Sequence, residues 1–545
     1  MFHKDWRQLA IQQLDAPFDL VIVGGGITGC GIFLDAAQRG LRVLMIEKQD
    51  IASGTSSRSS KLVHGGLRYL KQMQFRVTRT ACRERDRMLS LNPLLVQPIR
   101  FLYPAHKGDK IPGWKVDLGL WMYDRLTRLP EKHSHVSLEE FQRLAPGIDT
   151  TDLEMTLAYT DAMTDDARLT LAVAATGFAY GGLMLTRAEV AAPLRAPNGT
   201  LKGVVVRDLE SGKSYRIESH LVVNAAGVWV DRIRQLFDME GARLRPSRGS
   251  HIVLPHHRLP IKAAMMIPSP DDQRPVFLIP HPKGVLVGTT DIYHDGSLAD
   301  PRPTQDELSY LIRALQSQFP LAALSLGDIV AAFAGLRPIL DAHTDNPSAA
   351  SREEEIWEER GLLCVAGGKL TTWRPTAEEA VDEALTFIPE ERAQVAAPCS
   401  TKGTALVGLA PADLADRLER SLKLDAEIAN GAARRLRASA WRLSEVAHSR
   451  AELDPLIEGS DLCAAEVRAH LTGGAVLHLE DLLLRRARLG LWQPDLAVAV
   501  LPQLRPIFRE EMGWDNARWS REEASFDAAL EAWSPRGVTQ QSSPN

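Results

Sequence analysis

The chain has 545 residues, of which 45% are hydrophobic and 24% are charged, and its formal net charge is −5. A single hydrophobic core stops growing near roughly 250–300 residues, so this length predicts two or three structural units, and the average composition excludes gross disorder. The acidic balance offers no basic field to a nucleic acid, so no nucleic-acid partner is expected.

The cysteines and the N-terminal sequence bear on the cellular setting. Five cysteines are dispersed without a CxxC pair, which argues against a disulfide framework and a zinc site and favours the reducing cytosol. We therefore expect no metal. The first residues lack the apolar core of a signal peptide, and no window reaches ~18 uninterrupted apolar residues, so any membrane contact should be peripheral.

The first predicted unit is strand–helix–strand. The apolar run Phe18–Val23 is typical of a buried parallel strand. Residues 31–39 are a predicted helix that ends at Gly40, and residues 41–47 are the next predicted strand. This order is typical of the start of a nucleotide-binding domain.

The turn inside this unit carries a GxGxxG motif formed by Gly24, Gly26 and Gly29, with Thr28 within it. Such glycines permit a tight turn and a close approach of the backbone to a pyrophosphate, whose charge then faces the helix N-terminus. Glu47 ends the second strand, where an acid can bind ribose hydroxyls. The motif predicts a dinucleotide site but does not separate NAD from FAD.

Further predicted strands, at residues 204–207, 221–223 and 362–366, lie far apart in the sequence, so separate segments must assemble the nucleotide-binding unit. The stretch 221–227, which ends in Gly227, is similar to the second nucleotide-side motif of flavoproteins. Jointly with the glycine turn, it favours FAD.

A hydroxyl-rich stretch, residues 53–60, follows Glu47. Such a loop is usually a solvated linker, but at this place it could hydrogen-bond the pyrophosphate and the flavin ring. Farther along, residues 250–254, 276–280 and 285–289 predict an antiparallel sheet that forms the floor of a substrate chamber.

After Cys399 the composition shifts to Ala, Leu, Arg and Glu, with helical periodicity at residues 411–422, 464–470 and 477–488. We interpret this part as a separate helical domain. Its role is left open between dimerisation, a cap and a partner-docking surface.

Five stretches in one order carry a family resemblance. They are His-Gly-Gly-Leu-Arg-Tyr-Leu at 64–70, Arg-Gly-Ser-His-Ile-Val at 248–253, Gly-Thr-Thr-Asp at 288–291, Ala-Gly-Leu-Arg-Pro at 334–338 and Gly-Gly-Lys-Leu-Thr-Thr at 367–372. The series resembles the aerobic, respiratory FAD-dependent glycerol-3-phosphate dehydrogenases. It spans about residues 18–390 and extends more weakly through 465–467 and 480–486.

The resemblance implies an α/β fold. Its parts would be a Rossmann-like FAD-binding domain (1–105, 151–245 and 331–395), a membrane- or substrate-side segment (106–150), an antiparallel-sheet substrate domain (246–330) like those of glucose and D-amino-acid oxidases, and a C-terminal helical domain (400–535). The cofactor-binding residues that it implies are Gly24, Gly26, Thr28, Gly29, Glu47, Thr55, Ser56, Ser60, Lys61, Leu62, His64, Gly65, Gly66, Gly227, Gly368, Leu370 and Thr371.

The implied substrate is glycerol 3-phosphate. Arg68, Arg337 and Lys369 match the cations that would bind its phosphate, and Tyr69 would help to position substrate or flavin. His251 is the candidate general base, because imidazole ordinarily titrates near the working pH. Each residue also has an ordinary interpretation: a lone histidine on an apolar strand is often a core residue, and Arg337 could instead stabilise the alkoxide.

Three residues depart from the family pattern. Arg248 stands where lysine is expected, which keeps the charge but changes its geometry. Trp373 and Pro375 replace an expected tyrosine and basic residue. These changes should affect cofactor packing or substrate fit more than the reaction class.

Residues 111–123 are rich in apolar and aromatic side chains, and cations lie near them in the sequence, among them Lys115 and, upstream, Arg85. An apolar patch rimmed by cations suits a monotopic anchor to anionic lipid, although a buried helix with solvated neighbours is equally common. Because respiratory members pass electrons to quinone, we expect ubiquinone or menaquinone as acceptor and a cytoplasmic protein bound to the inner face of the membrane.

Three alternatives remain open at this stage. The same half-reaction could deliver its electrons to O2, as in glycerol-3-phosphate oxidases. An amine or amino-acid oxidase could use a similar scaffold but would not explain the full motif series. A flavin-bearing binding or scaffold protein would not need His251, Arg337 and Lys369. A homodimer is one option for the assembly.

Overall fold

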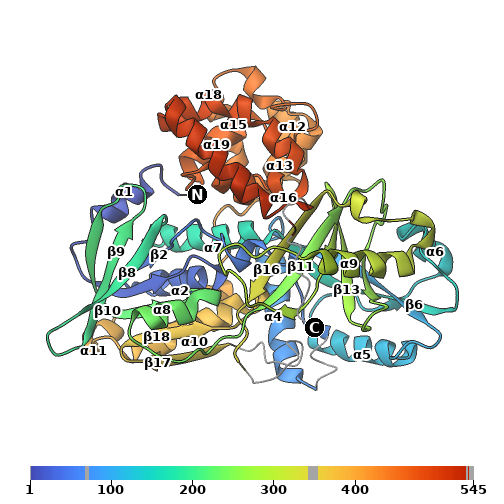
Figure 1. Ribbon diagram of the computed structural model, residues 1–545, viewed down its shortest axis with the longest axis horizontal. Coiled ribbons are helices and arrows are strands. Elements are labelled where there is room, and N and C mark those ends of the chain that lie inside the picture. The colour runs from blue at the N-terminus through green and yellow to red at the C-terminus, as the bar shows by residue number, and fades with distance from the viewer. Residues whose placement is uncertain (1, 68–72, 342–353, 536–537, 539–545) are drawn as a thin grey trace.

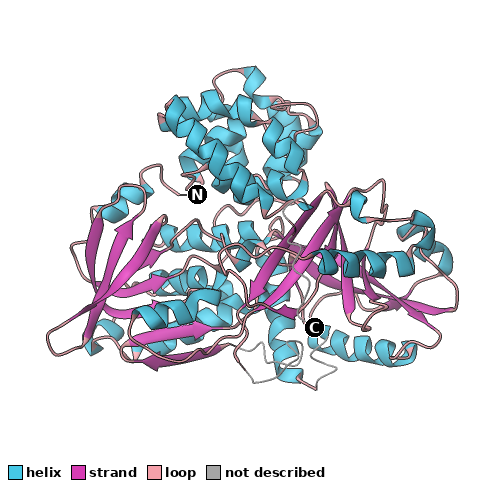
Figure 2. Cartoon of the chain, in the orientation of Figure 1, coloured by secondary structure: helices cyan, strands magenta, loops and turns pink. Residues whose placement is uncertain are grey.

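The computed structural model describes residues 2–67, 73–341, 354–535 and 538 (Figure 1). Two sheet-based lobes lie side by side, and a helical domain made from the end of the chain sits over them (Figures 1 and 2). The predicted fold class, a Rossmann-like unit with a substrate-side sheet and a C-terminal helical domain, is confirmed. Arg68 and Tyr69 lie outside the described residues.

The first sheet forms the nucleotide-binding lobe. Its strands run in the order β17-β18-β10-β1-β2-β7, while β9 pairs with both β10 and β8. Strands β18, β10, β1, β2 and β7 are mutually parallel, and apolar residues fill their buried stretches, as expected for strands covered on both faces. The bounds are β1 Phe18–Val23, β2 Val43–Ile46, β7 Leu183–Leu185, β8 Ala188–Arg195, β9 Leu201–Asp208, β10 Ser214–Asn224, β17 Glu355–Glu359 and β18 Leu362–Ala366.

Three helices pack closely against this sheet: α2 Ile27–Gln38, α7 Asp166–Ala179 and α10 Trp373–Leu385. Glycines set their spacing. A Cβ added at Gly31 of α2 would lie 2.9 Å from the Trp373 ring, and one at Gly177 of α7 would lie 2.6 Å from the Phe33 ring. Trp373 therefore packs against α2 at Gly31. The smaller α1 Trp6–Ile11, α8 Val230–Leu236 and α11 Glu390–Ala393 lie around the same lobe.

The second sheet has the order β15-β11-β14-β13-β12-β4-β6-β3, with β16 paired to β11 and β5 to β6. All of these pairs are antiparallel except β12 with β4. The three strands predicted for this region are present. The bounds are β3 Leu62–Val63, β4 Val96–His106, β5 Ser134–His135, β6 Leu153–Thr164, β11 Ser247–Leu254, β12 Ala264–Pro268, β13 Pro275–His281, β14 Gly284–Gly288, β15 Ile292–Tyr293 and β16 Ala331–Arg337.

Strands β3, β6 and β16, and all of β4 except His106, lie in segments that were expected to belong to the nucleotide-binding unit, yet they pair in the second sheet. Strand pairing over long sequence separations decides this membership, and local sequence pattern does not report it. The helices of this lobe are α4 Phe75–Leu91, α5 Gly113–Leu126, α6 Leu138–Leu144 and α9 Gln305–Gln318.

The helical domain begins near residue 400. Its helices are α12 Leu414–Leu422, α13 Ala426–Leu436, α14 Leu443–Val446, α15 Ala464–Gly473, α16 Leu489–Trp492, α17 Pro494–Ala499, α18 Leu501–Met512 and α19 Asn516–Glu531. Residues Asp481–Arg486 form a π-helix. One hydrophobic core joins Phe333 of the second sheet to Trp492 and Trp533 of this domain, so the domain is docked rather than tethered.

Among the helices of residues 2–67, 73–341 and 354–535, none has both the length and the apolar character needed to cross a bilayer.

Candidate active site

The glycine turn 24–29 has the geometry that its sequence predicts. Gly24 has φ +118°, and a Cβ there would lie 2.5 Å from the Ala225 carbonyl oxygen at the end of β10. The next turn opens α2, whose first amides have no acceptor within the helix. Of these, the Ile27 N–H donates to Ser56 Oγ at 2.9 Å. The glycine turn thus leads directly into a helix N-terminus, the arrangement that binds a pyrophosphate in dinucleotide-binding folds.

Glu47 closes this turn from the end of β2. Its Oε2 accepts the Gly25 N–H at 2.7 Å, and its Oε1 accepts the Gln49 N–H at 2.7 Å. Burial raises the pKa of this carboxyl, although both backbone hydrogen bonds oppose the rise. Glu47 is therefore part of the turn itself, and its contact with a ribose stays a prediction.

On the other side of the turn, two segments distant in sequence meet. The His64 N–H donates to Thr371 Oγ1 at 3.2 Å, and the Thr371 hydroxyl lies 3.3 Å from the His64 carbonyl. Gly368, just before Thr371, has φ +80°, and Gly227 at the end of β10 has φ +57°. The structure brings these predicted cofactor residues to one edge of the first sheet. Lys369 follows Gly368 in the same loop and also has an interaction partner.

The hydroxyl-rich loop bridges the two sheets. The Thr55 hydroxyl donates to the Leu336 carbonyl at 2.6 Å, and Ser60 Oγ lies 2.8 Å from His251 Nε2. The ammonium of Lys61, at the end of the loop, pairs with Asp166 at 3.0 Å. The loop is thus fixed to the inner face of β11 and β16 and is no solvated linker.

That inner face has a floor without side chains. The antiparallel register sets Ser247 opposite Arg337, Gly249 opposite Gly335, and His251 opposite Phe333. A Cβ at Gly249 would lie 2.3 Å from Arg337 Nη2, and one at Gly335 would lie 2.4 Å from the carbonyl oxygen of Arg58. The glycines therefore let the Arg337 guanidinium and the Arg58 carbonyl lie directly against the strand backbone, and His251 follows Gly249 on the same face of β11.

His251 is buried and held in one orientation. Its ring stacks on Phe333 with centroids 4.9 Å apart, and it lies so close to Gly288 that a Cβ there would be 2.3 Å from His251 Cδ2. Burial, and then the charges of Lys61 and Arg337, lower the pKa of His251 to about 3. The ring is therefore neutral at ordinary pH and can accept a proton, but it holds one weakly in the absence of an anion.

Arg337 is held by oxygen atoms on neighbouring strands. Its Nη1 lies 3.0 Å from an Asp291 carboxylate oxygen, and its Nη2 donates to Thr289 Oγ1 at 3.2 Å. Arg274 also pairs with Asp291 at 3.2 Å. By contrast Arg248 points to the opposite face of β11, where it pairs with Glu307 at 3.0 Å. The departure from the family pattern at Arg248 thus lies on the far face of the strand.

A buried network, which no sequence pattern indicated, supports the His64–Gly66 turn. The Gly65 N–H lies 2.9 Å from the Tyr123 hydroxyl and 3.1 Å from Asp161 Oδ1. Arg85 donates to Asp161 at 2.6 Å and to Tyr123 at 2.8 Å, and its side chain is fully buried. Placing Arg85 among the cations that rim a membrane patch was therefore wrong, because it neutralises a buried carboxylate beneath the site.

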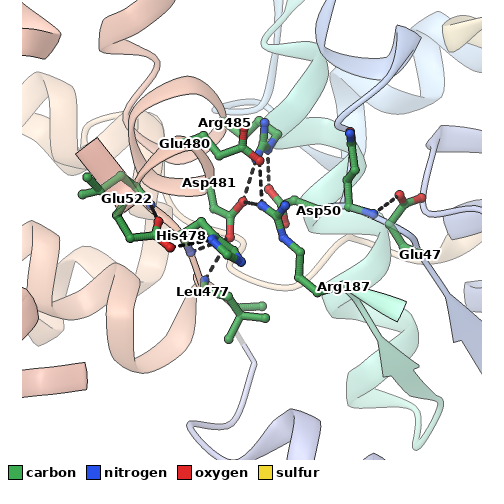
Figure 3. Close-up of polar contacts among 12 residues, drawn as sticks. Glu47, Asp50, Arg187, Leu477, His478, Glu480, Asp481, Arg485 and Glu522 are labelled. Atoms are coloured by element: carbon green, nitrogen blue, oxygen red, sulfur yellow. Dashed lines mark hydrogen bonds and ion pairs between the residues drawn. The ribbon is translucent and has the colours of Figure 1, made fainter. Parts of the chain in front are cut away.

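A second network, which we call the Asp50 clamp, joins the helical domain to the nucleotide-binding loop (Figure 3). Buried Asp50 accepts from Arg485 and from both Nη atoms of Arg486, one of them at 2.9 Å. Arg187, beside the same loop, pairs with Glu480 at 2.7 Å and with Asp481 at 2.5 Å. No local pattern marks Asp50 in the sequence.

The π-helix builds the helical domain's half of this clamp. Its wider winding is seen in the Ala487 N–H, which donates to the Leu482 carbonyl five residues back at 2.7 Å. Two successive arginines thereby reach one carboxylate. On the body side, the Ala52 N–H donates to the Gly25 carbonyl at 3.0 Å. The clamp is thus connected to the glycine turn by a few bonds.

Comparisons with known proteins agree along the whole chain. A protein-family model described as FAD dependent oxidoreductase matches residues 19–383, and one described as the C-terminal domain of alpha-glycerophosphate oxidase matches residues 399–519. The glycerol-3-phosphate dehydrogenase of Mycobacterium leprae is 36% identical over 97% of this chain and 90% of its own length. The aerobic glycerol-3-phosphate dehydrogenase of Staphylococcus haemolyticus is 38% identical over 72% of this chain and 71% of its own length.

Solved structures give the same result. The crystal structure of a glycerol-3-phosphate dehydrogenase from Bacillus halodurans complexed with FAD has a TM-score of 0.80 and 26% identity, and the match covers 99% of this chain and 100% of that one. The L-alpha-glycerophosphate oxidase of Mycoplasma pneumoniae matches with a TM-score of 0.53 and 20% identity over 67% of this chain and 94% of its own, a likeness of fold alone.

Proposed function

Since the chain belongs to the family of FAD-dependent glycerol-3-phosphate dehydrogenases, we propose that it oxidises sn-glycerol 3-phosphate to dihydroxyacetone phosphate and passes the electrons to a membrane quinone. The observation that carries the proposal is the backbone floor of Gly249 and Gly335 between Arg337 and His251. It places a cation, Arg337, and a proton acceptor, His251, on one face of the second sheet.

The residues present fit FAD. The tight approach at Gly24, the start of α2 directly after the glycine turn and the meeting of His64 with Thr371 suit a pyrophosphate and a flavin ring on one edge of the sheet. When bound, FAD supplies the acceptor for the hydride that leaves the secondary alcohol carbon.

The phosphate of the substrate would bind Arg337, helped by Lys369 and Arg68. An arginine fork binds a phosphate through paired hydrogen bonds, and Asp291 at 3.0 Å fixes the orientation of that fork. The two charges of the phosphate would offset the positive field of Arg337 and Lys61, which is part of what lowers the pKa of His251. Substrate binding would thus raise the proton affinity of His251 when the proton has to be taken.

His251 would accept the hydroxyl proton at Nε2 as the hydride leaves the carbon. Ser60 Oγ, 2.8 Å from that nitrogen, holds the ring ready before the substrate arrives. Stacking on Phe333 keeps the ring from turning away.

Helix α5 would bind the membrane where the quinone is dissolved. Trp114, Leu118 and Trp121 form one stripe along it and are 59%, 49% and 48% exposed. Lys115 and Arg125 lie over the rings of Trp114 and Trp121, at 5.4 and 4.8 Å, so cations border the apolar stripe. This arrangement suits the interface of an anionic bilayer on the cytoplasmic side. The helix lies away from the helical domain (Figure 1).

An anaerobic stopped-flow experiment with glycerol 3-phosphate tests the proposal. Flavin absorbance should bleach rapidly, and a soluble quinone analogue should restore it faster than air. Bleaching that air reverses faster than quinone would instead establish an oxidase. That second candidate is favoured by the match of residues 399–519 to a glycerophosphate oxidase domain. Absence of bleaching in the flavin-loaded protein would contradict both.

A further inference from the structure

A cavity of about 170 Å³ lies between the helical domain and the second sheet. Cationic side chains from both domains line it: Lys61, Arg168, Lys283, Arg434, Arg435 and Arg488. Asp165 and Asp461 are the carboxylates among its lining residues. The cations of the lining therefore outnumber its carboxylates.

Three of these cations are well compensated. Lys61 and Arg488 share Asp166, at 3.0 and 2.8 Å, and Arg435 pairs with Glu466 at 2.6 Å. These pairs explain how the charges are tolerated in a protein interior.

The other three cations, Arg168, Lys283 and Arg434, have too few carboxylate partners to offset their charges. Lys283 and Arg434 reach Asp461 only at 3.8 and 4.0 Å, and that carboxylate already binds Arg435 at 3.0 Å. Lys283 has one further contact, with an exposed glutamate at 3.6 Å. One carboxylate thus serves three cations around one side of the cavity.

Arg168 shows the same deficit from the other side. Its Nε is buried and has no hydrogen-bond acceptor among the residues that the structure describes. Burial lowers its pKa to about 9; Asp165 opposes the fall, while the charges of Arg437 and Arg435 deepen it. A buried donor without an acceptor is costly, so an anion in the cavity would relieve this cost.

The remaining wall is apolar. Trp492 stacks on His281 with centroids 3.8 Å apart, and Ile279, Leu286 and Leu489 also line the cavity. We propose that this cavity binds a small dianion of the phosphate-monoester or dicarboxylate class, held by Arg168, Lys283 and Arg434 with its carbon part against Trp492.

The site would have a regulatory consequence. Arg168 Nη1 donates to the carbonyl of Arg486 at 3.2 Å, and Arg486 binds Asp50 in the clamp. A dianion that binds Arg168 and Arg434 together joins the body to the helical domain beside this clamp. Because it binds the docked state only, it stabilises that state.

Selenate, a tetrahedral dianion that anomalous scattering can locate, is the probe. Crystals of the FAD-loaded protein are soaked with selenate, and its effect on Tm is titrated in solution. The Lys283→Gln/Arg434→Gln double variant removes two partly exposed cations, whose side chains are 18% and 35% exposed, so the fold should survive. Arg417→Gln, which removes an exposed cation of the same domain, is the matched control.

Selenate should occupy the cavity within hydrogen-bond distance of Arg168 in the wild type and in the control. In the double variant, the selenate concentration that gives half of the Tm rise should increase at least about tenfold, because two charge-assisted contacts are lost. Binding at Arg337 is common to all three proteins and cancels in the comparison. Selenate found only at Arg337, an empty cavity in the wild type, or undiminished occupancy in the double variant would overturn the proposal.

Discussion

The loop of residues 47–60 is held on its two sides by different kinds of chemistry. On the inner side, the glycine turn and Glu47 hold it through backbone amides and the absence of side chains. On the outer side, Arg485 and Arg486 hold it through charges that come from 435 and 436 residues farther along the chain. The inner side tolerates no added atom, whereas the outer side depends on a balance of buried charges.

A small change at the glycine turn, on the inner side of the loop, should abolish FAD binding. Gly24→Ala places a Cβ about where the Ala225 carbonyl lies, in a backbone conformation that favours glycine, so we expect loss of bound FAD. The flavin absorbance of the purified protein measures this. Gly40→Ala is the control, because Gly40 has φ +84° but nothing within 4 Å of the added atom. Full FAD content in Gly24→Ala would show that the glycine turn is not part of the FAD site.

A change at Arg337 should lower catalytic activity while the protein keeps its bound FAD. Arg337→Met removes a fork that can bind a phosphate, so kcat/KM for glycerol 3-phosphate should fall by about a hundredfold or more at unchanged FAD content. Arg248→Met, on the opposite face of the same sheet, should change kcat/KM far less. Equal losses in the two variants would mean that Arg337 acts only through stability.

A change in the Asp50 clamp, on the outer side of the loop, should weaken FAD binding without abolishing it. Arg486→Met leaves Asp50 with Arg485 alone, so the loop should loosen and the Kd for FAD should rise about tenfold, roughly 1.4 kcal/mol. Arg468→Met is the matched control, because Arg468 is equally buried and pairs with Glu452 and Glu511 inside the helical domain. FAD titration of the apoproteins compares them. An unchanged Kd in Arg486→Met, or the same increase in Arg468→Met, would show that the Asp50 clamp does not support FAD binding.

A smaller effect is expected where His478 joins the two domains. Burial alone would lower its pKa, but hydrogen bonds to Glu210 and Glu522, both at 2.8 Å, raise it to about 9. This stabilisation is complete below the unfolded pKa of about 6.5 and is lost as the pH rises through about 9, an effect of up to about 3 kcal/mol. Tm should therefore fall over this range, and His478→Gln should flatten that part of the profile. An identical fall of Tm with pH in His478→Gln would contradict the stabilising role of His478.

The smallest expected effect concerns the pH profile of kcat/KM, which should lack an inflection from His251. Because the pKa of His251 is about 3, kcat/KM should show no inflection near pH 6.5 from this residue. His251→Gln should still slow flavin reduction at saturating substrate. An inflection near pH 6.5 that disappears in His251→Gln would mean that the charges of Lys61 and Arg337 are offset before the substrate binds.

The parts of the fold that the sequence predicted are those with local causes. Strands β1 and β18 match their expected bounds, and the glycine turn lies between β1 and α2, because apolar runs and glycines act within a few residues. The helical domain was likewise visible in composition, and His251 and Arg337 share one face of the second sheet. The roles of these residues, and of Arg68 and Tyr69, remain predictions.

The parts that could not be predicted depend on distant pairing. Arg85 sits in an arginine-rich helix and resembles a surface cation, but Asp161 and Tyr123 make it a core residue. Asp50 resembles any loop acid until Arg486 is placed beside it. A charge is assigned to the surface by default, and only the tertiary structure shows which charges are exceptions.

The bare floor formed by Gly249 and Gly335 limits how this site can evolve. A methyl group at residue 335 would collide with the main chain of the loop at Arg58, and one at residue 249 would displace the Arg337 guanidinium. A side chain can therefore replace either glycine only if the Arg337 guanidinium or the loop at Arg58 moves as well, so natural substitutions at residues 249 and 335 should appear together with changes in those neighbours.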